Sequence, residues 1–96
     1  MHMRGPSYYQ WADSRLPNVF HMEEYRYGTK IDVAVRCSPS GCTQLFYGLY
    51  ERDGTRLYEE YIEKFPSNTT EDAMKWGIGR ARALVDSNFY SPARTT

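Results

Sequence analysis

The clearest pattern along the chain is an alternation of apolar and polar positions over residues 30–37, KIDVAVRC. Ile31, Val33 and Val35 would point to one side of an extended chain, and the residues between them to the other. This period of two is typical of a strand with one buried face. We therefore expect a strand over 30–37, followed by a turn over 38–41, where SPSG supplies turn-forming proline and glycine.

Two further strands are expected over 42–51 and 56–65, joined by a tight turn. Asp53-Gly54 lies between them, and this dipeptide tolerates the positive φ angles of hairpin turns. Pro66 has no N–H group to donate to a strand ladder, so it ends the last strand.

The length of the turn decides which side chains share a face of this hairpin. A two-residue turn puts Phe46, Gly48 and Tyr50 on one face with Leu57, Glu59 and Tyr61, and puts Leu45, Tyr47 and Leu49 on the other with Tyr58, Glu60 and Ile62. A three-residue loop that ends in a glycine bulge exchanges the two sets of the second strand. In both cases, each face carries aromatic side chains.

A C-terminal helix is predicted over 70–87. Asn68 or Thr69 can cap its start, with acidic residues in the first turn, where the helix dipole favours them. The apolar positions recur at helical spacing: Met74, Ile78, Ala81 and Val85, with Gly77 and Leu84 beside them. Gly77 and Gly79 weaken the helix, and either allow its backbone to approach the sheet or have no packing role.

The N-terminal part of the chain supports two interpretations. Ser7 can cap a short helix that ends before Pro17, with Tyr8, Trp11, Ala12 and Leu16 at helical spacing. The alternative is a partly disordered end. Met1-His2-Met3 resembles a vector-derived remnant, and Met22 is an alternative natural start.

These elements predict an α+β fold: a three-stranded antiparallel meander with a C-terminal helix on one face, or α-β-β-β-α if the first helix forms. The expected organisation is an N-terminal segment over 1–22, a single β-β-β-α domain over 23–89 and a flexible tail over 90–96.

One helix covers only one face of such a sheet, so we expect an aromatic surface on the other. The candidate interaction residues are Phe46, Tyr50, Tyr61 and Tyr58. Cover could come from the N-terminal segment, from a second copy of the chain or from another protein. Alternatively, the tyrosines lie on a solvated face, with their rings in cross-strand pairs. The favoured interpretation is a small non-catalytic interaction or self-association module that uses this face or an edge strand.

Composition narrows the range of activities. The chain has 96 residues, of which 41% are hydrophobic and 16% aromatic, enough for one domain with its own core. Twelve basic residues balance twelve acidic ones, so no long-range field attracts a polyanion or an anionic membrane. No apolar run approaches a membrane span and no secretory signal is evident, so we expect a cytoplasmic protein that does not bind membranes.

No catalytic arrangement, metal site or cofactor motif is predicted. Cys37 and Cys42 supply only half of a tetrahedral zinc site, so two free thiols are favoured over a hairpin disulfide. Glu59 and Glu60 point to opposite faces of a strand, and therefore do not form an acid-base pair.

Nucleic-acid binding is the second interpretation. The order α-β-β-β-α resembles that of double-stranded RNA-binding domains, which implies contacts from the final helix, here from Lys75, Arg80 and Arg82. That family has lysines at the start of this helix, whereas Glu71 and Asp72 here would repel phosphate.

The chain also resembles small bacterial domains that have no assigned activity. The matching stretches are Tyr25-Arg26-Tyr27-Gly28, then 46–54 with its Asp-Gly turn, then the helix from Thr70-Glu71-Asp72-Ala73 to Val85-Asp86. This resemblance covers 25–86 and implies the fold only. The expected partner is a protein or a second copy of the chain.

Overall fold

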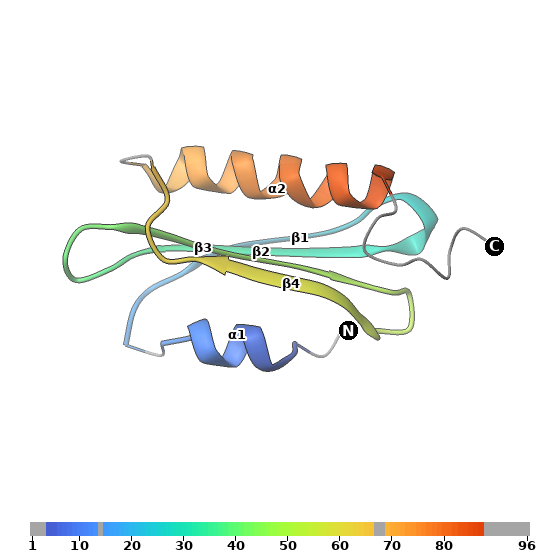
Figure 1. Cartoon of the computed structure of the whole chain (residues 1–96), viewed down its shortest axis with the longest axis horizontal. Helices are drawn as coiled ribbons and strands as arrows, with labels where there is room; N and C mark the ends of the chain where they lie inside the picture. Colours follow the sequence, from blue (N-terminus) through green and yellow to red (C-terminus); the bar gives the residue numbers. More distant parts are fainter. Residues whose placement is uncertain (1–3, 14, 67–68, 88–96) are drawn as a thin grey trace.

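The computed structural model of the chain describes residues 4–13, 15–66 and 69–87. In this part of the chain, a four-stranded antiparallel sheet lies between two helices (Figure 1). The elements in chain order are α1 (Pro6–Trp11), β1 (Val19–Glu24), the 3₁₀ turn η1 (Arg26–Gly28), β2 (Lys30–Cys37), β3 (Thr43–Tyr50), β4 (Arg56–Ile62) and α2 (Thr70–Ser87). The predicted α+β class, antiparallel sheet and C-terminal helix are confirmed.

The sheet has four strands in the order β1-β2-β3-β4, so the prediction of three strands was wrong. β1 is the missed strand. It pairs with β2 along its whole length, from Val19 opposite Val35 to Glu24 opposite Lys30. Its alternation is weak because side chains on both of its faces are exposed at the edge of the sheet, so neither face has to be uniformly apolar. β1 also runs across residues 22 and 23, where the predicted N-terminal segment and domain meet.

The two faces of the sheet carry separate hydrophobic clusters. The larger lies under α2 and contains the buried side chains Ile31, Val33, Val35, Leu45, Tyr47, Leu49, Ala73, Ala81, Leu84 and Val85. The smaller lies under α1 and consists of Trp11, Ala34 and Phe46, with Tyr8 and Tyr61 packed against it. We call these two sides the α2 face and the α1 face.

α2 begins and packs largely as the sequence predicted. The Thr69 hydroxyl accepts a hydrogen bond from the backbone N–H of Asp72 at 3.1 Å, so Thr69 caps the first turn. Gly77 lies against the sheet: an added Cβ atom would come within 2.8 Å of Val33 Cγ1 and 2.9 Å of Leu45 Cδ1. Gly79 has nothing within 4 Å of that position. Close approach to the sheet therefore explains the first glycine and not the second.

The β3–β4 hairpin combines features of both predicted turns. Glu51 donates its N–H to Thr55 O at 2.8 Å, which leaves a three-residue loop in which Gly54 has φ of 95°. The register then shifts by one residue between Leu49 and Tyr50, which corresponds to a bulge at Leu57 on β4. This second irregularity restores the face pattern expected of a two-residue turn, with Phe46 opposite Tyr61.

α1 is a helix of six residues whose N-cap is Gly5, with Pro6 in the first turn and no side-chain cap. The predicted cap, Ser7, is instead inside the helix. Proline is favoured at the first helical position because its missing N–H would have no helical partner there. The helix ends at Trp11, earlier than the predicted stop at Pro17.

Candidate interaction edge

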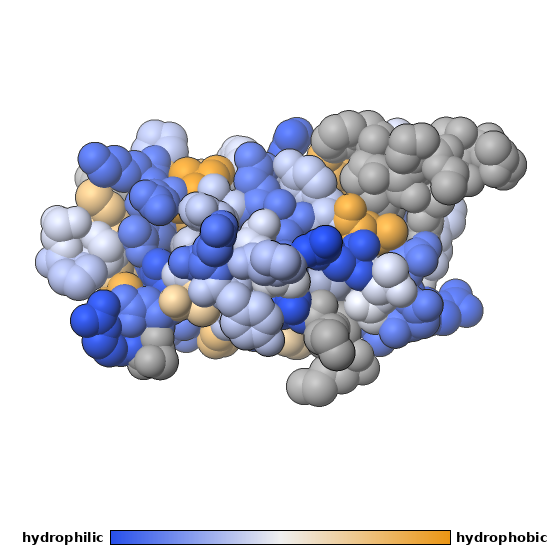
Figure 2. Space-filling view, turned by 60° about the horizontal axis from the view of Figure 1, so that its bottom comes forward, coloured by the Kyte–Doolittle hydropathy of each residue, from blue (hydrophilic) through white to orange (hydrophobic). Residues whose placement is uncertain are grey.

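The aromatic face predicted to be free is covered by the chain itself. Phe46 and Tyr50 are fully buried, so the expectation of an exposed surface at these two residues was wrong. α1 lies on this face, with the Tyr8 and Trp11 rings 5.0 and 5.9 Å from the ring of Phe46. On the α1 side of the molecule, hydrophobic residues appear as small separate groups among hydrophilic ones (Figure 2).

Tyr61 and Tyr58 are half-buried on opposite faces of β4. Tyr61 packs against the cluster under α1, and Tyr58 against the cluster under α2. The Tyr58 hydroxyl donates to Glu60 at 3.0 Å, and the Tyr47 hydroxyl makes a short hydrogen bond to the same carboxylate. The four predicted aromatics therefore do not form one continuous surface.

A polar row crosses the α1 face beside the aromatic cluster. Asp32, Gly48 and Glu59 are direct neighbours on β2, β3 and β4. An added Cβ atom at Gly48 would lie 2.5 Å from the hydroxyl oxygen of Tyr50, so the absence of a side chain makes room for that hydroxyl. The hydroxyl donates to Glu59 Oε2 at 2.5 Å. Burial, and then the hydrogen bond to Glu59, raise the pKa of Tyr50 well above its usual range.

The N-terminal segment is anchored on this polar row. Arg4 forms a bidentate ion pair with the buried carboxylate of Asp32. Its Nε donates to Oδ2 at 2.6 Å and its Nη2 donates to Oδ1 at 3.1 Å. The backbone N–H of Gly5 donates to Glu59 Oε2 at 2.7 Å. A buried carboxylate needs such partners, because leaving it without them would be costly. The row therefore holds α1 over the sheet.

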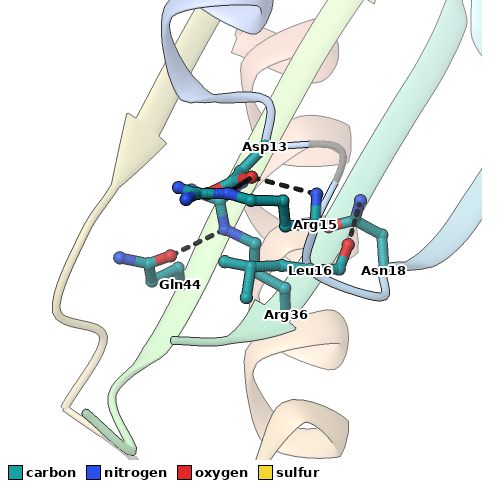
Figure 3. A network of polar contacts seen from close by, with 6 residues as sticks. All are labelled: Asp13, Arg15, Leu16, Asn18, Arg36 and Gln44. Carbon is teal, nitrogen blue, oxygen red and sulfur yellow. Dashed lines mark hydrogen bonds and ion pairs between the residues drawn. The ribbon is translucent and has the colours of Figure 1, made fainter. Parts of the chain in front are cut away.

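A second polar network lies where the chain passes from α1 to β1 (Figure 3). The buried guanidinium group of Arg36 lies 3.9 Å from the centre of the Trp11 ring, and its Nε donates to Gln44 Oε1 at 2.6 Å. Burial lowers the pKa of Arg36. Asp13 and Arg15 pair beside it, and the Arg15 hydrogen bonds lower the pKa of Asp13 to about 2. The Arg36 contacts tie the end of α1 to β2 and β3, and the Asp13–Arg15 pair is a local contact in the connection that follows.

The basic residues predicted to contact nucleic acid are engaged within the protein. Lys75 Nζ lies 3.7 Å from Glu71 Oε1 in an exposed ion pair on the same helix. Arg82 donates two hydrogen bonds to the Glu23 carboxylate, at 2.8 and 2.7 Å. A hydrogen bond to Tyr47 raises the pKa of Arg80. The order α-β-β-β-α, on which the resemblance to RNA-binding domains depended, gains a fourth strand. Nucleic-acid binding stays a prediction.

The free surface of the sheet lies at an edge. β1 has a strand on one side only, and three of its six side chains are large, apolar and exposed: Val19 by 58%, Phe20 by 46% and Met22 by 55%. An edge strand offers unpaired backbone N–H and C=O groups to another strand. β1 is therefore both apolar and open to pairing.

The opposite edge, β4, is protected. It carries charged side chains at Arg56, Glu59 and Glu60, and the register shift at Leu57 interrupts its regular pairing. α1 packs against it, and no large apolar side chain of β4 is exposed. Charges, bulges and covering segments are the usual means by which proteins prevent edge pairing. β1, by contrast, has no proline or bulge, and its two acidic residues, Glu23 and Glu24, are confined to its end.

β1 is held firmly in place by contacts at both faces. On the α2 face, Glu23 accepts two hydrogen bonds from Arg82 and lies 2.6 Å from His21 Nε2. The Arg82 hydrogen bonds are the main cause of the lowered pKa of Glu23. On the α1 face, the guanidinium carbon of Arg4 lies 5.1 Å from the centre of the Phe20 ring. The edge is thus a fixed strand and not a loose segment.

The sequence contained a signal for this strand. The run Val19-Phe20-His21-Met22 contains a β-branched and an aromatic residue, which favour strands, and it follows Pro17-Asn18. What the run lacks is a clear alternation, and its place in the sheet depends on pairing with residues 30–35.

Cys37 and Cys42 are both free thiols. Among the residues that the structure describes, no three His, Cys, Asp or Glu side chains come together in a group that could hold a metal ion. No helix in residues 4–13 or 69–87 is long and apolar enough to cross a membrane.

The fold and the edge together define a small α+β protein in which an antiparallel sheet is covered by a helix on each face and open along β1. No family model, curated protein or solved structure matches this chain. The resemblance to small bacterial domains stays a prediction.

Proposed function

We propose that this protein is a small non-catalytic interaction module that binds an extended protein segment along β1, as a fifth strand of its sheet. In this mode of recognition, backbone hydrogen bonds supply the affinity, and side chains at alternate positions supply the specificity. Of the two surfaces predicted from the sequence, the aromatic sheet face and an edge strand, the proposal keeps the edge.

The observation that carries the proposal is the concentration of exposed apolar side chains on the unpaired strand. Six large hydrophobic side chains are exposed in the described part of the chain. Three of them, Val19, Phe20 and Met22, belong to β1 and lie within a stretch of four consecutive residues. The other three, Tyr9, Tyr27 and Trp76, are in separate elements. Scattered exposure is ordinary, whereas a group on an open edge favours pairing.

The two faces of β1 would contribute differently to a bound strand. Phe20 and Met22 are on the α1 face, where they offer an apolar surface to every second residue of the ligand. On the α2 face, Val19 borders a shallow groove toward Met74 and Lys75 of α2, and Glu23 is held by Arg82. We therefore expect a ligand whose α1-face residues are apolar and whose α2-face residues are more polar.

The test is selection from a random octapeptide library displayed on phage, followed by fluorescence polarisation with the recovered peptides. Met22→Lys places a charge on the apolar side of β1, so we expect it to weaken binding at least about tenfold. Tyr9→Lys is the matched control, since it makes the same kind of change at an exposed aromatic of α1, and should leave the affinity unaltered.

Amide signals of the isotope-labelled protein locate the bound peptide. Shifts and added protection from hydrogen exchange should concentrate in residues 19–24. The proposal is wrong if no peptide is selected, if Met22→Lys binds as well as the wild type, or if the shifted amides belong to β4 or α2.

A further inference from the structure

The exposed strand is complementary to itself. We propose that the segment bound along β1 is β1 of a second copy of this chain. The two strands form an antiparallel pair, and the two-fold axis passes midway between the two copies of His21. This inference rests on the proposed function and names the partner for the same edge.

Symmetry restricts the possible registers. A symmetric pair of identical chains uses the same patch on both copies, and an axis perpendicular to the sheet keeps each face on its own side. Successive side chains alternate between the two faces of a sheet. Each residue must therefore lie opposite a partner residue whose side chain is on the same face. The axis therefore passes midway between the two copies of one residue, and the residues near the centre of β1 that it could relate in this way are Phe20, His21 and Met22.

Of these, the axis at His21 makes the best use of the apolar side chains. It places Phe20 of each copy opposite Met22 of the other, so that four exposed apolar side chains form one continuous group on the α1 face. An axis at Phe20 would place Met22 opposite Asn18, and an axis at Met22 would place Phe20 opposite the carboxylate of Glu24.

Charge favours the same arrangement. β1 is uncharged at its start, Val19-Phe20, and acidic at its end, Glu23-Glu24. Antiparallel pairing about His21 brings the acidic end of each copy beside the neutral end of the other, so the carboxylates of the two copies are kept apart. Each His21 faces its counterpart but has its own Glu23 at 2.6 Å. The whole chain has a formal net charge of zero, so the copies do not repel each other at long range.

The helices leave room for a continuous sheet of two copies. α2 packs mainly over β2 and β3, and α1 packs mainly against β4, so neither helix has its main packing on β1. Figure 1 shows that the two helices lie on opposite sides of the sheet. With strands about 4.8 Å apart, α2 lies two strand spacings from the new seam, and the two α2 helices lie about 19 Å apart. A helix is only about 10–12 Å wide, so they do not collide.

A pair of six-residue strands buries less surface than a standard stable interface, so we expect a weak, concentration-dependent dimer. Analytical ultracentrifugation of the wild-type chain from about 10 to 500 μM should show a monomer–dimer equilibrium. Met22→Lys should shift it to monomer, and Tyr9→Lys should not.

Disulfide trapping tests the register. Cys37→Ser/Cys42→Ser removes both native thiols and is the background for single-cysteine variants. His21→Cys should cross-link to itself, because the axis brings the two copies of this position together. Phe20→Cys and Met22→Cys should cross-link poorly alone and well in an equimolar mixture. Tyr9→Cys, exposed on α1, gives the background rate.

The outcomes separate this inference from the proposed function. A chain that stays monomeric at 500 μM, or whose Phe20→Cys or Met22→Cys variant cross-links to itself faster than His21→Cys, overturns the self-pairing. If octapeptides still bind β1 in that case, the proposed function stands and only the partner is wrong. If they do not bind either, both proposals fail.

Discussion

Gly77 and Gly79 provide an internal test of how α2 packs on the sheet. The two glycines are two residues apart in the same helix, yet only Gly77 faces other side chains. An added methyl group at Gly77 would lie 2.8 Å from Val33 Cγ1 and 2.9 Å from Leu45 Cδ1, whereas ordinary contacts of this kind are 3.4–4 Å. Replacement by alanine therefore overpacks one site and leaves the other unobstructed.

The expected magnitudes follow from two opposing effects. Alanine in place of glycine in a helix interior stabilises by about 1 kcal/mol, and this applies to both positions. Overpacking a closely filled core typically costs about 1–3 kcal/mol, and this applies only to Gly77. We therefore expect Gly79→Ala to stabilise by about 1 kcal/mol. Gly77→Ala should range from neutral to destabilising by about 2 kcal/mol.

Urea denaturation followed by circular dichroism measures both variants. The quantity of interest is the difference between them, about 1–3 kcal/mol, because the helix-propensity gain cancels. Gly77→Ala should also cost less in a Val33→Ala background, where the closest methyl group is missing. If the two glycine variants are equally stabilised, or if the Val33→Ala background makes no difference, the close packing of α2 on β2 and β3 is refuted.

Three further predictions concern the α1 face and β1. Trp11→Ala should destabilise the protein by about 3–5 kcal/mol and increase binding of a hydrophobic dye, because it uncovers Phe46; a loss below about 1 kcal/mol in urea denaturation would show that α1 contributes little to the fold. Gly48→Ala should cost about 1–3 kcal/mol by displacing the Tyr50 hydroxyl from Glu59, and less in a Tyr50→Phe background; an equal cost in both, measured the same way, would contradict this explanation. The hydrogen bonds from Arg82 lower the pKa of Glu23 from its ordinary value of 4.5, so this contribution to stability is complete above pH 4.5 and is lost as the pH falls through the folded-state pKa. Thermal melting of Glu23→Gln against the wild type should therefore show a gap that closes toward acid pH, and a gap that is constant with pH would argue against the ion pair.

Local sequence patterns determined the elements whose signals are complete within one segment. The strand Lys30–Cys37 and the helix Thr70–Ser87 have the predicted bounds. The helix is buried on one side, which gives its apolar positions a period of about 3.6. The strand is buried on both faces, but only its α2 face is uniformly apolar, and its α1 face carries Asp32 and Arg36, so a period of two is still visible in the sequence. The cap at Thr69 is equally local, since its side chain reaches a backbone N–H only three residues away.

The register of the β3–β4 hairpin was only half determined by its sequence. Asp53-Gly54 predicted a tight turn, but not that a three-residue loop and a second shift at Leu57 would together leave Phe46 opposite Tyr61. Two irregularities that cancel cannot be recognised from turn residues alone. Packing decides between them, because a shift of one residue would exchange the side chains under α1 and α2.

The tertiary structure alone decided the fourth strand and the cover of the second face. β1 has a weak pattern because side chains on both of its faces are exposed, so its existence depends on pairing with β2. The cover depends on contacts between distant segments, with Arg4 on Asp32 and Trp11 on Phe46. A six-residue helix without a side-chain cap has little stability of its own, so its position is set by what it packs against. For that reason the sequence showed that two faces needed cover, and only the folded chain showed that the surface left open is the edge at β1.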